Sequence, residues 1–322
     1  MGSLLRADWL RIRRRWDVWI IVLGIPALAL FAYVAGALSA GNSYIQYGGD
    51  VPPDFLQHIA AQEAMQRALS ALPFQFPRSI ATMTQGATMW LILGAAFLAA
   101  SMLGNEFSWG TIRNVALFRP DRVRYLATRL GWLVGLILLT FGVIVVLGMV
   151  APLILRVDPG DPSALTSGQL NGDQFGGPMG PIGPIGPISL GGALLAAGSI
   201  VVVAVAAMGL AGLAALRFRS PATGMLVAGM YVVAEGIAAG LIMSRATGDL
   251  RYVPQMALSI RLGALISDVQ VAVGLAASGS GPNGSPGWVA LPPPVGLAIV
   301  AVWLVGLYGL WFVVLRRADI HE

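Results

Sequence analysis

Residues 130–155 read LGWLVGLILLTFGVIVVLGMVAPLIL and contain no charged side chain. A bilayer core is about 30 Å thick, and a helix needs roughly 20 apolar residues to cross it. This stretch therefore predicts a membrane-spanning helix. Five other stretches have similar length and apolarity, which gives six predicted spans in all. They are residues 19–38, 84–103, 130–155, 189–216, 221–243 and 295–315.

The composition of the whole chain supports the same fold class. Of the 322 residues, 57% are hydrophobic and only 11% are charged, whereas soluble domains carry about 25% charged residues. So few charges cannot cover a water-facing surface, which excludes a soluble enzyme, a coiled coil and a disordered regulator. We predict an all-α membrane protein with one transmembrane domain over residues 1–322.

Two residue types are missing from the sequence, and each absence excludes a kind of chemistry. There is no cysteine, so disulfides, thiolate metal sites and cysteine nucleophiles are excluded. All 20 basic residues are arginine, and without lysine the chain has neither a Walker A phosphate loop nor a Schiff-base nucleophile. His58 and His321 lie far apart without companion ligands, so no metal site is predicted. We predict that the chain is not an enzyme and has no catalytic residues or cofactor of its own.

The arginines are unevenly distributed between the loops, and this predicts the topology. Fourteen of them fall on the segments that lie on the same side as the termini in a six-span chain: Arg6, Arg11, Arg13, Arg14, Arg15, Arg113, Arg119, Arg122, Arg124, Arg129, Arg217, Arg219, Arg316 and Arg317. By the positive-inside rule both termini are cytoplasmic. The net charge of +5 is explained by this topology, so no nucleic-acid partner is predicted.

The N-terminal residues 1–18 show an amphipathic pattern. At helical spacing Leu5, Trp9, Ile12 and Trp16 form one stripe, and the arginines occupy the other faces. This predicts a helix lying in the lipid headgroup region; the alternative is a basic flank that only sets topology. The predicted lipid contacts are Trp9, Arg11, Arg13, Arg14, Arg15 and Trp16.

The cytoplasmic loop 105–120, NEFSWGTIRNVALFRP, combines apolar and basic side chains. Trp109, Ile112 and Ala116 are spaced as one helical face, and Pro120 ends the helix before Asp121 can cap the next one. The loop therefore predicts a short helix across the cytoplasmic mouth that serves as a docking surface.

This loop, from Glu106-Phe-Ser-Trp-Gly-Thr-Ile-Arg113 to Arg119-Pro120, resembles the permease subunits of ATP-binding-cassette (ABC) exporters of the type-2 export class. The run Leu5–Arg14 is similar to that family's connecting helix. The resemblance implies that the loop is a coupling helix seated in a separate ATPase subunit, which binds ATP and Mg. It further implies a pair of permeases, by default a homodimer, with two ATPase copies in a bacterial plasma (inner) membrane. The coupling contacts would come from Glu106, Trp109, Gly110, Thr111, Arg113 and Arg119.

Three outside segments, 41–78, 156–188 and 244–294, connect the spans on the other side. The first predicts a helix over 55–72. The second has four Gly-Pro-X triplets, which favour an extended spacer, with a partner-binding tether as the alternative. The third has an apolar helical stripe with Arg261 off it, which predicts an amphipathic helix. It resembles the outer interfacial or re-entrant helix of the same permease class, and the alternative is an ordinary surface helix on the membrane. The stripe consists of Leu258, Leu262, Leu265, Ile266, Val269 and Val273.

Glu235 is the one ionisable residue well inside a predicted span. Because a charge in the membrane is costly, it is either a group of the substrate path that binds a cation or proton, or a protonated carboxyl hydrogen-bonded between helices. The first interpretation leaves open a proton-coupled secondary transporter that works through Glu235. A non-transporting mechanical or sensory ABC-type subunit is a further alternative.

Overall fold

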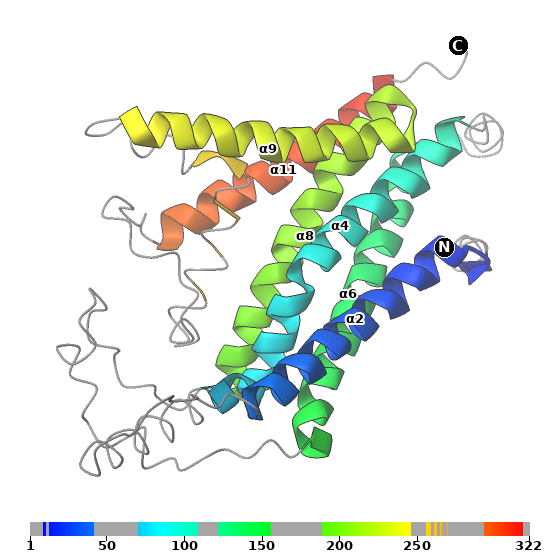
Figure 1. Ribbon diagram of the computed structural model, residues 1–322. Helices are drawn as coiled ribbons and strands as arrows, with labels where there is room; N and C mark the ends of the chain where they lie inside the picture. Colours follow the sequence, from blue (N-terminus) through cyan, green and yellow to red (C-terminus); the bar gives the residue numbers. More distant parts are fainter. Residues whose placement is uncertain are drawn as a thin grey trace, which may run out of the picture.

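The computed structural model describes residues 9–10, 13–41, 70–108, 122–155, 189–245, 256–258, 261–262, 265, 269 and 293–317, and in that part of the chain all regular structure is helical. Figure 1 shows the helices. They are α2 (Trp16–Gly41), the short 3-10 helix η1 (Leu72–Phe74), α4 (Arg78–Ser108), α6 (Arg122–Leu155), α8 (Leu190–Phe218), α9 (Pro221–Arg245) and α11 (Pro293–Arg317).

Six of these helices are long and apolar enough to cross a membrane, which confirms the six predicted spans. Each predicted range falls within one helix, except that Ser189 lies just before α8 and caps it, accepting a 3.0 Å hydrogen bond from the amide of Gly192. Ser220 caps α9 by accepting a hydrogen bond from the amide of Thr223. The chain thus fits an integral multi-pass membrane protein.

Two helices extend well beyond their apolar cores. α4 begins at Arg78 rather than Thr84 because polar side chains in its first turns find acceptors: Ser79 Oγ donates to Gly148 O at 2.7 Å, and Thr84 Oγ1 to Ile80 O at 2.6 Å. α6 begins at Arg122 rather than Leu130. Hydropathy marks the apolar part of a span and misses polar turns that continue the same helix.

Helices α2, α4, α6 and α8 lie side by side, whereas α9 and α11 are strongly tilted against them (Figure 1). The contact between α4 and α8 is the most extensive among the described helices. The main core contains apolar side chains from α2, α4, α6, α8 and α11, among them Val22, Leu98, Leu133, Ile200 and Trp311. Beyond Ala228, most side chains of α9 are exposed on this single chain.

The glycine and alanine residues of the fourth and fifth spans allow close helix packing inside the chain. A Cβ at Gly224 of α9 would lie 2.7 Å from Cβ of Ala215 and 2.9 Å from the carbonyl oxygen of Ala211, both on α8. These small side chains therefore bring α8 and α9 together within one subunit.

One end of the bundle holds the start of α2, the end of α4, the start of α6, the α8–α9 turn and the end of α11 (Figure 1). We call it the arginine-rich end. The described arginines there are Arg13, Arg14, Arg15, Arg122, Arg124, Arg129, Arg217, Arg219, Arg316 and Arg317.

The N-terminal segment differs from the prediction of one helix over 1–18. Residues 9, 10 and 13 are helical, but the helix is broken at Arg14 and Arg15, and α2 begins at Trp16. At this break Arg15 forms an ion pair with Asp17, which lies in the first turn of α2.

Candidate functional site

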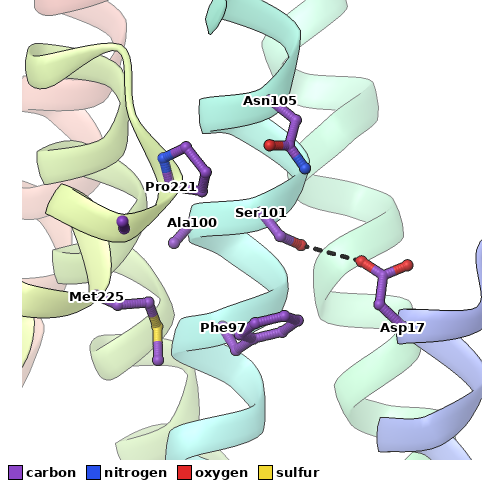
Figure 2. Close-up of a pocket in the computed structure, with 8 residues that line it drawn as sticks. Asp17, Phe97, Ala100, Ser101, Asn105, Pro221 and Met225 are labelled. Atoms are coloured by element: carbon purple, nitrogen blue, oxygen red, sulfur yellow. Dashed lines mark hydrogen bonds between the residues drawn. The ribbon is translucent and has the colours of Figure 1, made fainter.

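A cavity of about 290 Å³ lies at the arginine-rich end, between α2, α4 and α9 (Figure 2). Side chains from three helices that are far apart in the sequence meet there. It is lined by Asp17, Phe97, Ala100, Ser101, Asn105, Pro221, Ala222 and Met225.

The floor of the cavity is one face of α4. Phe97, Ser101 and Asn105 are four residues apart, so they share a helical face. In Figure 2 they lie between Asp17 on one side and Pro221 and Met225 on the other. Gly104 sets how closely α9 approaches, since a Cβ there would lie 2.5 Å from the backbone nitrogen of Pro221.

Asp17, the charged residue of the lining, forms an ion pair with Arg15 that is held on α4. Arg15 Nε donates to Asp17 Oδ1 at 3.1 Å, and Arg15 Nη2 donates to Asp17 Oδ2 at 2.5 Å. Ser101 Oγ joins both groups, accepting from Arg15 Nη2 at 3.2 Å and donating to Asp17 Oδ2 at 3.4 Å. The Arg15 and Asp17 side chains keep 27% and 29% of their surface exposed, so both charges are open to solvent.

An apolar stripe on α4 continues from the cavity toward the other end of the bundle. Trp90, Leu93 and Phe97 are 49%, 43% and 41% exposed, although most of α4 is buried. Helical spacing puts all three on the face that carries Ser101. We call the cavity together with the exposed stripe beside it the groove; its charged lining residue, Asp17, and its exposed apolar side chains suit amphipathic molecules better than free ions.

The N-terminal segment packs on the bundle beside this site. Trp9 stacks on Trp132 of α6 with ring centroids 5.5 Å apart, and its edge meets Trp19 of α2 at 6.5 Å. Trp16 instead is 82% exposed. The sequence puts Trp9 and Trp16 on one lipid-facing stripe. In the structure, however, Trp9 stacks on another aromatic ring, whereas most of the Trp16 surface is exposed. Of the other predicted lipid contacts, Arg13 and Arg14 are exposed, Arg15 binds Asp17, and Arg11 lies outside the described residues.

Glu235 does not line the cavity. Its Oε1 accepts a 2.8 Å hydrogen bond from the hydroxyl of Tyr231, one turn earlier on α9. Tyr231 packs toward the outer segment, where it contacts the cluster of Leu258 and Leu262 with Val300. The structure therefore separates the predicted substrate-path residue from the groove.

The coupling residues fall largely outside the described part of the chain. Glu106 lies in the last turn of α4, so residues 105–108 continue that helix rather than begin a loop. Trp109, Gly110, Thr111, Arg113 and Arg119 lie outside the described residues, as do segment 156–188 and most of the predicted helix 55–72.

The described residues of the outer segment are helical at 258, 261, 262, 265 and 269. Leu258 and Leu262 are buried, as the apolar stripe predicts. Arg261, which the sequence puts off the apolar stripe, is nevertheless buried and only 3% exposed. Gly296 of α11 makes room for it: a Cβ at that position would lie 2.9 Å from Arg261 Nη2.

Sequence reasoning missed Asp17, Ser101 and Asn105 as site residues. Asp17 follows a run of arginines and looks like part of the same basic flank. The helical spacing of Phe97, Ser101 and Asn105 was the available signal, since two polar side chains extend an apolar face toward the end of a span.

Comparison with known proteins gives little further guidance. No family model matches the chain, and no solved structure matches it. Over 141 residues the chain is 26% identical to the uncharacterized protein YhcI of Bacillus subtilis (strain 168). The match covers 37% of this chain and 44% of that protein, so the chain spans less than half of its relative's length.

Proposed function

We propose that the chain is the membrane-spanning permease subunit of an ABC export complex, in which two permease copies enclose the translocation path and two separate ATPase subunits bind loop 105–120. The observation that carries the proposal is the position of the groove. It ends at Asn105, where the coupling segment begins, so a movement of that segment would act directly on the groove through α4.

The exposed faces of α9 and α11 support a pair of permeases. Leu226, Met230, Val233 and Ile237 recur at helical spacing on α9 and are each about 60% exposed, at 62%, 63%, 61% and 61%. On α11, Val302 and Val305 are 71% and 74% exposed. A second copy would cover part of this surface and convert the one-sided groove of each copy into an enclosed path. Two-fold symmetry is the commonest arrangement of homo-oligomers, so a homodimer is the default.

The test is co-purification of the tagged chain from its native membrane, followed by an ATPase assay of the eluate. We expect an ATPase subunit to accompany the wild-type chain and to be lost with Glu106→Ala and with Gly110→Pro. Glu235→Gln is the matched control, because it also removes a carboxylate but lies on α9, and it should keep the ATPase.

An eluate without ATPase activity would overturn the proposal. If transport then persisted in vesicles without ATP and was lost in Glu235→Gln, the proton-coupled transporter would replace it.

A further inference from the structure

We propose that the cavity between α2, α4 and α9 binds the headgroup of a phospholipid that carries both an ammonium and a phosphate, as phosphatidylethanolamine does, with an acyl chain along the stripe on α4. This inference rests on the proposed function in treating the groove as a ligand path. Its test, however, requires neither an ATPase nor transport.

The charged end of the groove matches a zwitterionic headgroup. Asp17 is the charged side chain among the described residues that line the cavity, and Arg15 binds its carboxylate from the neighbouring turn. A ligand ammonium can bind Asp17 while the adjacent phosphate binds Arg15, because both side chains are partly exposed. The phosphate of an anionic lipid without the amine could still bind Arg15, but the lipid would bring no cation to the Asp17 carboxylate beside it.

Ser101 is suited to lie between the two ligand charges. Its hydroxyl already accepts from Arg15 and donates to Asp17, so it can keep one partner while a ligand atom takes the place of the other. Hydrogen bonds to the headgroup would therefore replace existing ones, and no buried polar group would lose its partner.

The apolar length of the groove matches one acyl chain. From Ser101 to Trp90 the α4 axis rises by about 16 Å at about 1.5 Å per residue, which is about half of a hydrocarbon core about 30 Å thick. Phe97 and Met225 line the cavity where the chain would begin, and Leu93 and Trp90 extend the path. A free amine or a sugar would use none of this exposed surface.

The experiment is a titration of the purified full-length chain in detergent with phosphatidylethanolamine, phosphatidylglycerol and an alkylammonium, all with matched chain length, read by native mass spectrometry. We expect phosphatidylethanolamine to bind most tightly. Asp17→Asn should weaken its binding about tenfold, because the variant lacks the charge that holds the ligand ammonium. Arg15→Gln should weaken both phospholipids.

Two further variants keep the result interpretable if Asp17→Asn folds poorly. Ala222→Trp places a large side chain at an exposed position of the lining and should block phospholipid binding without altering the ion pair. Glu235→Gln removes a carboxylate elsewhere and should leave binding unchanged.

Equal binding of both phospholipids, unaffected by Asp17→Asn and Ala222→Trp, would overturn the proposal, as would alkylammonium binding as tight as that of phosphatidylethanolamine. Lipid binding in a chain that never co-purifies with an ATPase would overturn the proposed function alone.

Discussion

The indole nitrogen of Trp311 on α11 donates a 2.6 Å hydrogen bond to the carbonyl oxygen of Gly209 on α8. The Trp311 side chain is completely buried, and its ring occupies the space that a Cβ at Gly212 would need. A large aromatic ring thus fits against a helix backbone because two glycines one turn apart leave the surface of α8 open. This contact holds the tilted last span against the bundle.

Gly212→Ala should therefore destabilise the folded chain. The added methyl group meets a ring that has no free space to move into, and overpacking of this kind costs about 1–3 kcal/mol. Thermal unfolding in detergent would show a lower melting temperature. Gly198→Ala on the same helix is the control, since nothing lies within 4 Å of its Cβ position. Equal melting temperatures for the two variants would contradict the packing described here.

Gly104→Ala should open the groove rather than loosen the last span. The backbone of Pro221 lies 2.5 Å from the Cβ position and cannot rotate away as a side chain could, so the start of α9 must shift from α4. We expect a maleimide to react faster with a single cysteine at M225C in the Gly104→Ala background. Gly86→Ala, which meets nothing within 4 Å, should leave that rate unchanged. An unchanged rate in Gly104→Ala would show that α9 does not rest on this glycine.

The six spans could be predicted from the sequence because a bilayer imposes long apolar runs, and residues 130–155 are the plainest example. The groove could not, because it depends on which helix faces meet. Asp17 and Ser101 are far apart in the sequence, and their 3.4 Å contact exists only because α2 packs on α4. The burial of Arg261 was missed for the same reason, since its surroundings depend on the glycine at position 296 of another helix.

Trp9→Ala should release the N-terminal segment from the bundle. Stacked aromatic pairs contribute about 0.5–1.5 kcal/mol beyond area burial, and a change of about 1 kcal/mol alters a population about fivefold. Trypsin should then cut the chain after Arg13 or Arg14 about fivefold faster, because cleavage of the backbone follows the population of the released segment. Trp16→Ala is the matched control, because Trp16 belongs to the same segment but is 82% exposed. Equal rates in the two variants would mean that the stack on Trp132 does not hold the segment.

The orientation in the membrane can be tested at the two ends of α8. Leu190 and Arg219 are both exposed, at opposite ends of one helix, and Arg219 belongs to the arginine-rich end. Because arginine-rich segments are retained in the cytoplasm, an impermeant maleimide should label L190C but not R219C in intact cells. Inverted vesicles should give the reverse pattern. The natural chain has no cysteine, so each single-cysteine variant reports only its own position. Labelling of R219C in intact cells would place the groove and loop 105–120 outside, where no ATP-dependent partner could bind, and would exclude the coupling to an ATPase proposed above.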